Sequence, residues 1–500
     1  MFLGYISLLF SKLIFFFSSV RHKKKLPPKP YLNIKNELLK NGFSKIFDLL
    51  SKNLKPPLGK IKNYWGISSE IFFGCYLWDT AFISQVWKYW DAKIAYEILK
   101  PFIDNQLMDG RISDFINPFK IGNKTQPPLL AWAISDLDVP IEYLNEVYPI
   151  LRRFNEWLYD NRRLKNGLFS WIDPCESGIN NSPRLSDMSG KSKKDLSNLA
   201  TIDLNSYIVL QNKALIKIAK KLDDSKFIRY NYKSDILEYE EKNKKLIDLI
   251  QKYLWDAEYG LYFDYNFNEE RRIEINTIAS FLPLTAEIPN EQQILALIKH
   301  LESSFEYNTK IPLPSVAHND KKFTKDMGSG PVWLNLAYLV IKGLEKKEIL
   351  KFSGELAYKL VKAIFKTYTN EGSFYEFYDP DRYDLKKLSR MKGNLYKRLT
   401  RGKKPVKNFV GWTGLVNSLL IESIIGFDII EKTIQPRFPE DFKGKNLELG
   451  FPAFKFVLEI SYSSDKDIII KLSDLERKKE DLIKKCSLYQ KISLKEFFAN

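Results

Sequence analysis

The helical periodicity of most of the chain is the feature that most constrains its fold. From about residue 35 to residue 426, apolar residues recur every three or four positions in long segments. Several of these segments carry apolar residues on more than one face, which is typical of helices enclosed by other helices. The pattern predicts a large all-α domain. The clearest helical segments are residues 141–161, 203–222, 291–301, 332–344, 348–368 and 411–425.

The links between these segments are long and rich in Gly, Pro, Asn and Asp. Functional side chains are often found on loops of this kind, which a rigid scaffold positions. We therefore expect toroidal packing of the helices, with the functional residues on loops at one end. About a dozen helical segments fit an (α/α)6 barrel, whereas periodicity alone supports only a large helical domain.

The chain after the helical region has a different pattern. Residues 454–464 and 466–473 alternate or are rich in β-branched side chains, which predicts a β-hairpin. Residues 474–490 are expected to form a charged surface helix. We expect a barrel domain over residues 34–430, followed by a small appendage of β-hairpin and terminal helix over residues 431–500.

The N-terminal residues 1–25 form a strongly apolar run, interrupted by Lys12, that ends in the basic stretch RHKKK. They lack a basic start and a small-residue cleavage site, which argues against a cleaved signal peptide. Basic residues after such a run favour a cytoplasmic position for the following domain. We expect membrane association on the cytoplasmic side through an anchor or interfacial helix, a helix packed on the domain being the alternative. A proline-rich linker is expected over residues 26–33.

Cysteine and histidine content limits the chemistry of the chain. Cys75, Cys175 and Cys486 are far apart and odd in number, which favours a reducing compartment over a disulfide framework. The chain has only three histidines, and no Cys/His spacing resembles a zinc site. Acid–base chemistry must therefore come mainly from carboxylates, and no metal or other cofactor is expected.

The net charge of +17 is unevenly distributed. Residues 382–407 hold eleven Lys or Arg and one acidic residue, Asp384. This basic insert could contact anionic lipid or a pyrophosphate-linked sugar, or it could be a solvated loop. No recognisable nucleic-acid-binding motif accompanies it, so no nucleic-acid partner is expected. The sequence gives no indication of the oligomeric state.

Four loop clusters combine carboxylates or amides with aromatic rings. They are YLWDTAF with Trp78 and Asp79, TQPPLLAWA with Gln126 and Trp132, WIDPCESGINNSPR, and GSFYEFYDPD with Glu376. Aromatic faces stack on the C–H surfaces of sugars, while carboxylates and amides hydrogen-bond the hydroxyl groups. Each cluster alone is also consistent with a packed aromatic ring beside a helix cap. Together they favour a carbohydrate partner.

The residues of these clusters, and their order along the chain, resemble the motifs of the glycoside hydrolase family 63 clan. That clan includes processing α-glucosidases, bacterial mannosylglycerate hydrolases and, more distantly, trehalases. The resemblance runs from about Tyr76 to Ile425, and its more specific markers are ESG-x-x-NSP, EFYDPD and GWTGL. It implies an (α/α)6 barrel that hydrolyses an α-linked glucoside or mannoside with inversion.

The resemblance also implies roles for individual residues. Glu376 corresponds to the general base of the family, and Asp79 to a ligand of the sugar hydroxyls. Further positions correspond to the walls and contacts of the sugar pocket. They are Trp78, Gln126, Trp132, Asn181, Trp333 and Trp412.

Two departures from the family pattern fall where the reacting sugar is contacted. The family's general acid is an aspartate in ESG-x-Asp-Asn-Ser-Pro, and Asn180 stands at that position. An amide cannot donate an acidic proton, and a missing general acid costs about 10²–10⁴ in rate. Before GPVW, where the family often has Trp-Arg-Gly, the residues are Gly328, Ser329 and Gly330, so a sugar-contacting arginine is absent.

Three interpretations of Asn180 stay open. Another acid could serve, Glu176 being the nearest candidate, with Asp173 and Asp187 also within eight residues. The leaving group could need little protonation, as in a sugar phosphate or a lipid-pyrophosphate-linked sugar. Alternatively, the protein could be a catalytically impaired enzyme that binds carbohydrate without cutting it. Because (α/α)6 barrels also carry lyases, epimerases and phosphorylases, another carbohydrate chemistry is a fourth alternative.

Overall fold

The computed structural model describes residues 24–185, 196–225, 230–391, 398–399, 401–463 and 467–499. Most of the predicted N-terminal anchor, residues 1–23, and part of the basic insert lie outside the described residues. Among the described helices, none combines the length and apolarity that crossing a bilayer requires.

One set of helices is buried almost all round. Every residue of α3 and α6 is buried, as the lack of a polar face in their sequences requires. The set consists of α3 (Leu77–Trp87), α6 (Leu130–Ser135), α8 (Ile202–Asp224), α10 (Leu282–Thr285), α12 (Leu334–Lys346), α15 (Leu415–Ser418) and the π-helix η3 (Leu419–Ile425).

A second set of helices is amphipathic and covers the first. Their ends follow local rules: Asn290 and Gln293 form a capping box at the start of α11, and left-handed Gly372 ends α13. The set consists of α2 (Glu37–Asn53), α7 (Ile141–Arg162), α9 (Tyr232–Tyr253), α11 (Glu291–Glu302) and α13 (Leu350–Glu371), with the short α4 (Ala92–Glu97) and α5 (Lys100–Asp104).

The buried helices contact one another in a closed sequence. α3 contacts α6, α6 contacts α8, α8 contacts α10, α10 contacts α12, α12 contacts α15, and α15 contacts α3. Apart from the pairs α4–α5 and α15–η3, buried and covering helices alternate along the chain. The predicted large helical domain is confirmed.

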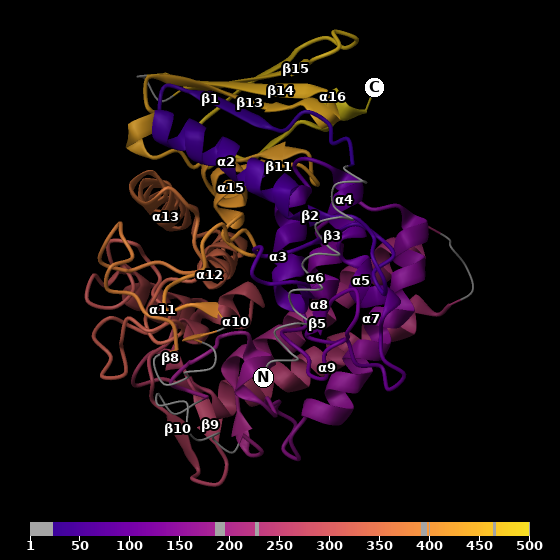
Figure 1. Cartoon of the computed structure of the whole chain (residues 1–500), viewed down its shortest axis with the longest axis vertical. Helices are drawn as coiled ribbons and strands as arrows, with labels where there is room; N and C mark the ends of the chain where they lie inside the picture. The colour runs from indigo at the N-terminus through magenta and orange to yellow at the C-terminus, as the bar shows by residue number, and fades with distance from the viewer. Residues whose placement is uncertain are drawn as a thin grey trace.

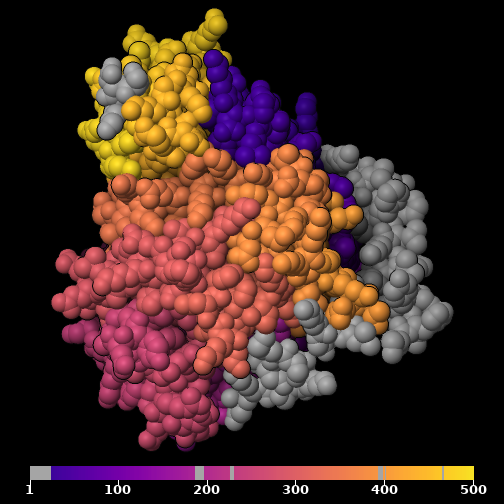
Figure 2. Space-filling model, turned by 90° about the vertical axis from the view of Figure 1, so that its left-hand side faces the viewer, coloured from indigo at the N-terminus to yellow at the C-terminus, as the bar shows by residue number. Residues whose placement is uncertain are grey.

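A five-stranded antiparallel sheet lies at one end of the helical domain, next to α2 (Figure 1). Its order is β1 (Tyr31–Ile34), β13 (Lys445–Phe451), β14 (Phe456–Tyr462), β15 (Ile468–Asp474) and β16 (Leu482–Cys486). The space-filling view shows the indigo N-terminal residues beside the yellow C-terminal ones at this end (Figure 2). The predicted hairpin is confirmed as β14 and β15.

Two predictions near this sheet were wrong. Residues 31–33, assigned to the linker, belong to β1 and pair with β13. The three prolines precede the strand, so they remove no donor from its ladder. Residues 474–490 form no helix, because residues 482–486 are the edge strand β16. A charged edge strand has the same composition as a charged surface helix, and charge is a common protection of sheet edges.

The remaining elements are short. The strands are β2 (Leu54–Lys55), β3 (Trp65–Gly66), β4 (Cys75–Tyr76), β5 (Phe115–Ile116), β6 (Leu199–Ala200), β7 (Trp255–Asp256), β8 (Leu261–Tyr262), β9 (Asp264–Asn266), β10 (Arg271–Ile273), β11 (Phe427–Asp428), β12 (Thr433–Ile434) and β17 (Ile492–Ser493). The helical turns are η1 (Pro174–Ser177), η2 (Ile278–Phe281), η4 (Glu440–Phe442), η5 (Pro452–Phe454) and α16 (Lys495–Phe498).

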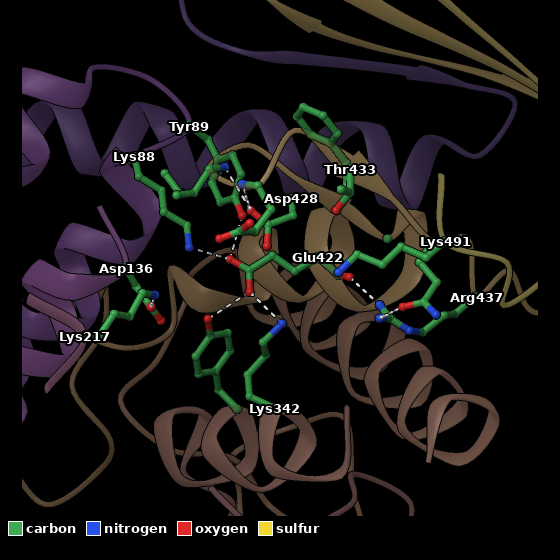
Figure 3. A pocket seen from close by; sticks show the side chains of 16 residues that line it. Lys88, Tyr89, Asp136, Lys217, Lys342, Glu422, Asp428, Thr433, Arg437 and Lys491 are labelled. Atoms are coloured by element: carbon green, nitrogen blue, oxygen red, sulfur yellow. Dashed lines mark hydrogen bonds and ion pairs between the residues drawn. The ribbon is translucent and has the colours of Figure 1, made fainter. Parts of the chain in front are cut away.

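A charged cavity of about 160 Å³ lies where the C-terminal ends of α3 and α6 meet the segment after η3 (Figure 3). Glu422 of the π-helix stands at its centre and accepts hydrogen bonds from Tyr89 Oη (2.6 Å) and Tyr338 Oη (2.9 Å). Its carboxylate also pairs with Lys88 Nζ (3.0 Å) and Lys342 Nζ (3.2 Å). These partners come from the residues just after α3 and from α12, so Glu422 of η3 ties three parts of the chain together.

We expect Glu422→Gln to destabilise the protein at neutral pH by about 3–5 kcal/mol, because it leaves the buried Lys88 without its anion. It also removes one of the two carboxylates that pair with Lys342, the other being Glu345. Burial alone would raise the pKa of Glu422, but the charges of Lys88 and Lys342 outweigh it and lower the pKa to about 2. The stability that this carboxylate contributes is therefore lost as the pH falls below the pKa that Glu422 has in the unfolded chain. Thermal unfolding should show the difference from wild type shrinking at acidic pH.

The matched control is Glu431→Gln, since Glu431 lines the same cavity but is exposed. It should change the free energy of unfolding by no more than about 0.5 kcal/mol. Equal effects of the two substitutions would contradict the assigned role of Glu422.

Candidate active site

The start of α3 carries Trp78 and Asp79 into the interior. Gln126 Oε1 accepts from the Trp78 backbone N–H (3.3 Å), so this glutamine satisfies a free donor at the helix N-terminus. Asp79 is 7% exposed, and Ser68 Oγ donates to Asp79 Oδ1. Both predicted side chains therefore lie at one site, with Gln126 acting on the backbone of α3.

The predicted tryptophans form a continuous aromatic cluster. The ring of Trp412 lies 5.0 Å from that of Trp333 in a stacked arrangement and 6.2 Å from that of Trp78. Trp333 stacks in turn on Phe377, with ring centroids 6.0 Å apart. Trp132 lies one ring further away, joined to Trp78 through Phe82.

Glu376 lies beside this cluster on a loop that other segments hold. Its backbone N–H donates to Val406 O (3.0 Å), and Trp412 Nε1–H donates to its carbonyl oxygen (2.7 Å). The side chain is 3% exposed, and its carboxylate forms an ion pair with Arg390. The candidate base is therefore buried and fixed at the backbone, with a guanidinium group directly against it.

The loop that carries Asn180 is packed closely by two glycines. Gly178 has φ +75°, and a Cβ there would fall 1.6 Å from the ring of Trp78. A Cβ on Gly328 would fall 2.2 Å from Asn180 O. Asn180 itself is half-buried, and its side-chain amide forms no hydrogen bond within the described parts of the chain. The amide is therefore available at the expected acid position.

Asn181 contacts protein groups. Its Nδ2 donates to Asp326 Oδ2 (2.9 Å), and its carbonyl oxygen accepts from Ser329 Oγ (2.6 Å). Asn181, which the sequence predicts to contact the sugar, thus joins its own loop to the segment before GPVW. Arg184 anchors the other end of this loop through buried ion pairs with Asp203 (2.8 Å) and Asp264 (2.6 Å).

The structure contradicts the prediction of Glu176 as a substitute acid. Arg162 Nη2 lies 2.7 Å from Glu176 Oε1, and Arg162 Nε donates to Oε2 (3.0 Å). Arg162 engages both oxygens of this buried carboxylate, so neither oxygen is free to meet a leaving group. Asp173 pairs with Lys124 Nζ (2.7 Å), and Asp187 lies outside the described residues.

Three residues at the site were missed from the sequence: Arg390, Asp326 and Ser68. Arg390 lies in the basic insert, where its neighbours are equally basic, and nothing in the sequence distinguishes it. Asp326 and Ser68 are ordinary loop residues by composition. A buried arginine beside a predicted base was detectable only once the pairing of the loops was known.

Burial shapes the charges at the site. It raises the pKa of Asp79 to about 7, partly offset by the hydrogen bond from Ser68. Burial, with the charge of Arg401, lowers the pKa of Arg390 to about 9, so the guanidinium stays protonated at neutral pH. Within the described ranges, no three His, Cys, Asp or Glu side chains are placed to hold a metal ion.

The comparisons with known proteins show the family of the chain. The family model described as "Mannosylglycerate hydrolase MGH1-like glycoside hydrolase domain" matches residues 74–392. The chain belongs to this family. It is a family 63-like glycosidase, and the matched range contains every predicted site residue except Trp412.

The matches with relatives of this glycosidase cover different shares of each relative's length. Mannosylglycerate hydrolase of Thermus thermophilus is 25% identical over 379 residues, which cover 61% of this chain and 88% of that protein. An uncharacterized protein of Borreliella burgdorferi is 28% identical over 324 residues, and the match covers 62% of each chain.

Solved structures show the same fold. The family 63 mannosylglycerate hydrolase of Thermus thermophilus in complex with glucose superposes with a TM-score of 0.59 at 22% identity, over 75% of this chain and 98% of that one. Neutral trehalase from Saccharomyces cerevisiae gives a TM-score of 0.55 at 16% identity, over 72% and 74%.

We expect Asp79→Asn to stabilise this glycosidase at about pH 8 by up to about 4 kcal/mol, the equivalent of a pKa raised from 3.8 to about 7. A folded-state pKa above the unfolded value means that stability is lost as the pH rises through the folded pKa. The amide carries no such penalty. Thermal unfolding should show the gain fading as the pH falls toward 4.

Asp136→Asn is the opposite case and serves as the control. Burial would raise the pKa of Asp136, but the charges of Lys217 and Lys88 outweigh it and lower the pKa. Its replacement should therefore cost stability at the same alkaline pH. A gain for Asp79→Asn that does not vary with pH would contradict the assignment.

Proposed function

We propose that this chain hydrolyses an α-linked glucoside or mannoside with inversion at the anomeric carbon. The proposal includes an (α/α)6 toroid whose inner wall is the closed sequence of buried helices. It rests above all on the position of Glu376, a buried carboxylate fixed at the backbone beside the tryptophan cluster. Family membership and the convergence of the predicted loops support the same reading.

Inversion needs a carboxylate that activates water on the face of the sugar opposite the leaving oxygen. Glu376 takes this role in the proposal. Trp412 and Val406 hold its peptide from both sides, so the loop that carries the carboxylate is fixed beside the tryptophan cluster. The rings of Trp78, Trp333 and Trp412 supply apolar faces for the sugar, and Asp79 supplies acceptors for its hydroxyl groups.

The leaving oxygen meets Asn180, whose amide can donate a hydrogen bond but cannot transfer an acidic proton. With Glu176 engaged by Arg162, no carboxylic acid on this loop replaces it within the described residues. The proposed hydrolase therefore acts best on substrates whose leaving group departs without full protonation.

The second candidate is a carbohydrate-binding protein that has lost hydrolysis. Two observations favour it: Asn180 at the acid position and the ion pair that engages Glu376. In this reading the aromatic cluster and Asp79 bind glycan, and Asn180 is one more hydrogen-bonding group.

Hydrolysis of para-nitrophenyl α-glucoside and α-mannoside separates these candidates, since an activated leaving group needs no acid. We expect the wild type to cleave at least one of them and to release the β-anomer first, seen by proton NMR. Glu376→Gln should lower kcat by about 10²–10⁴, and Asn180→Asp should raise kcat on natural disaccharides.

Glu355→Gln, the same change at an exposed position of α13, should leave the rates unchanged. Cleavage that survives Glu376→Gln would refute the assigned base. Glycan binding without cleavage by the wild type or Asn180→Asp would establish the second candidate.

A further inference from the structure

The basic insert places one of its arginines against the candidate base. Ser389 N–H donates to Lys325 O (2.9 Å), and Met327 N–H donates to Ser389 O (3.1 Å). The insert is thus paired, through its backbone, with the segment that precedes GPVW. The next residue, Arg390, is 2% exposed, and its guanidinium group meets Glu376. This part of the insert is built into the site.

A second guanidinium group lies near the first. Arg390 Cζ is 5.8 Å and Arg401 Cζ is 5.4 Å from the ring centroid of Phe72. Arg401 is half-buried and has no ion-pair partner in the described part of the chain. Placing two like charges close together costs free energy, which a bound anion relieves. The carboxylates that face this pair are Glu376 and Asp326.

The segment that carries Arg390 is also connected to the loop of Asn180. Asp326 accepts from Ser389 Oγ (2.9 Å) in the insert and from Asn181 Nδ2 (2.9 Å) in that loop. The insert and the expected acid loop therefore share one carboxylate as a common support. In place of a carboxylic acid, this loop carries a neutral amide, and it shares Asp326 with the segment that holds Arg390.

We propose that this site acts on glycosides whose leaving group is a phosphate or diphosphate ester, and that Arg390 and Arg401 bind its anionic oxygens. The inference rests on the proposed function and names its substrate class. Guanidinium groups match phosphate in geometry and stay charged when buried. A phosphate is a far weaker base than a sugar alkoxide, so it leaves without the proton that Asn180 cannot supply.

The reaction balances without a general acid. Water attacks the anomeric carbon, and the bond from that carbon to the phosphate oxygen breaks with its electron pair kept by the oxygen. One proton of the water passes to Glu376 and then to solvent. A glycosyl phosphate monoanion and water thus give free sugar, the hydrogen phosphate dianion and one released proton.

The ion pair between Arg390 and Glu376 gives this substrate class a second effect. A carboxylate engaged by a guanidinium group is a poor proton acceptor, because protonation would break the pair. A bound phosphate competes for the same guanidinium group and so leaves the Glu376 oxygen to accept a proton from water. Binding of the correct leaving group thereby activates the base.

The test compares hydrolysis of α-glucosyl and α-mannosyl phosphate, UDP-glucose and GDP-mannose with that of the two para-nitrophenyl glycosides, using the full chain. The reactions are run in water enriched in the heavy oxygen isotope. Cleavage at the anomeric carbon places the isotope in the sugar, and cleavage at phosphorus would place it in the phosphate. Preference for the monoesters indicates a soluble sugar phosphate, and preference for the diphosphates a nucleotide- or lipid-linked sugar.

The variants are Arg390→Gln and Arg401→Gln, with Arg382→Gln as the matched control. Arg382 lies in the same insert and pairs with Asp384 away from the base. We expect the ratio of kcat/KM for phosphate esters to that for aryl glycosides to fall about 10–100-fold in the first two variants. The ratio should stay unchanged in the control. Because Arg401 is half-buried, its variant stays informative if Arg390→Gln does not fold.

The failures of the two proposals are distinguishable. Cleavage of aryl glycosides without cleavage of any phosphate ester would overturn the substrate class and leave the proposed hydrolase standing. Cleavage of neither would overturn both. Heavy isotope found in the phosphate would also overturn the inference. So would an equal loss of kcat/KM on phosphate esters and aryl glycosides in both arginine variants, because it would give the arginines a purely structural role.

Discussion

The candidate site depends on the indole of Trp412. One side chain donates a hydrogen bond to the carbonyl oxygen of Glu376 and stacks on Trp333, and its ring also lies near Trp78. These partners belong to the base loop, to the residue that starts α12, and to α3. The base loop also pairs with the segment before α12, since Val332 and Tyr378 exchange backbone hydrogen bonds of 2.9 and 3.0 Å. A single ring thus fixes three parts of the chain, and catalytic positioning depends on such fixed geometry.

Close packing of the loop with Asn180 bears on how the departure from the family should be understood. Gly178 and Gly328 permit approaches that any side chain would prevent, and Arg184 holds the end of the loop with two buried carboxylates. A loop that had merely drifted from its role would not need such contacts on both sides. The loop that carries the expected acid position is therefore held closely on both sides. This favours a site adapted to another leaving group over one in decay.

The sequence predicted the helical domain well because the signals for buried and amphipathic helices are local. It failed at β1 and β16, since pairing with β13 and β15 is a long-range property that composition does not record. Among the predicted site residues, the structure brings Trp78, Trp333 and Trp412 together beside the loop of Glu376. Glu176 was chosen by its nearness along the chain and pairs with Arg162. Arg390 was missed for a related reason, because eleven basic residues in one run look alike until backbone pairing selects one.

The two ends of α3 separate function from stability. At its start, burial disfavours the ionised form of Asp79, which is therefore reached only as the pH rises through a pKa of about 7. At its end, about 13 Å away along the helix axis, Lys88 joins the network of Glu422, where two lysines and two tyrosines favour the charged form. An unfavourable buried charge is tolerated at a functional site when the surrounding structure is stabilised elsewhere. Because the same rigid helix carries both ends, the stabilising network can hold the strained end in place without contacting it. The charged cavity around Glu422 therefore lies away from the predicted chemistry, and Glu422 is paired with Lys88 and Lys342 at its centre.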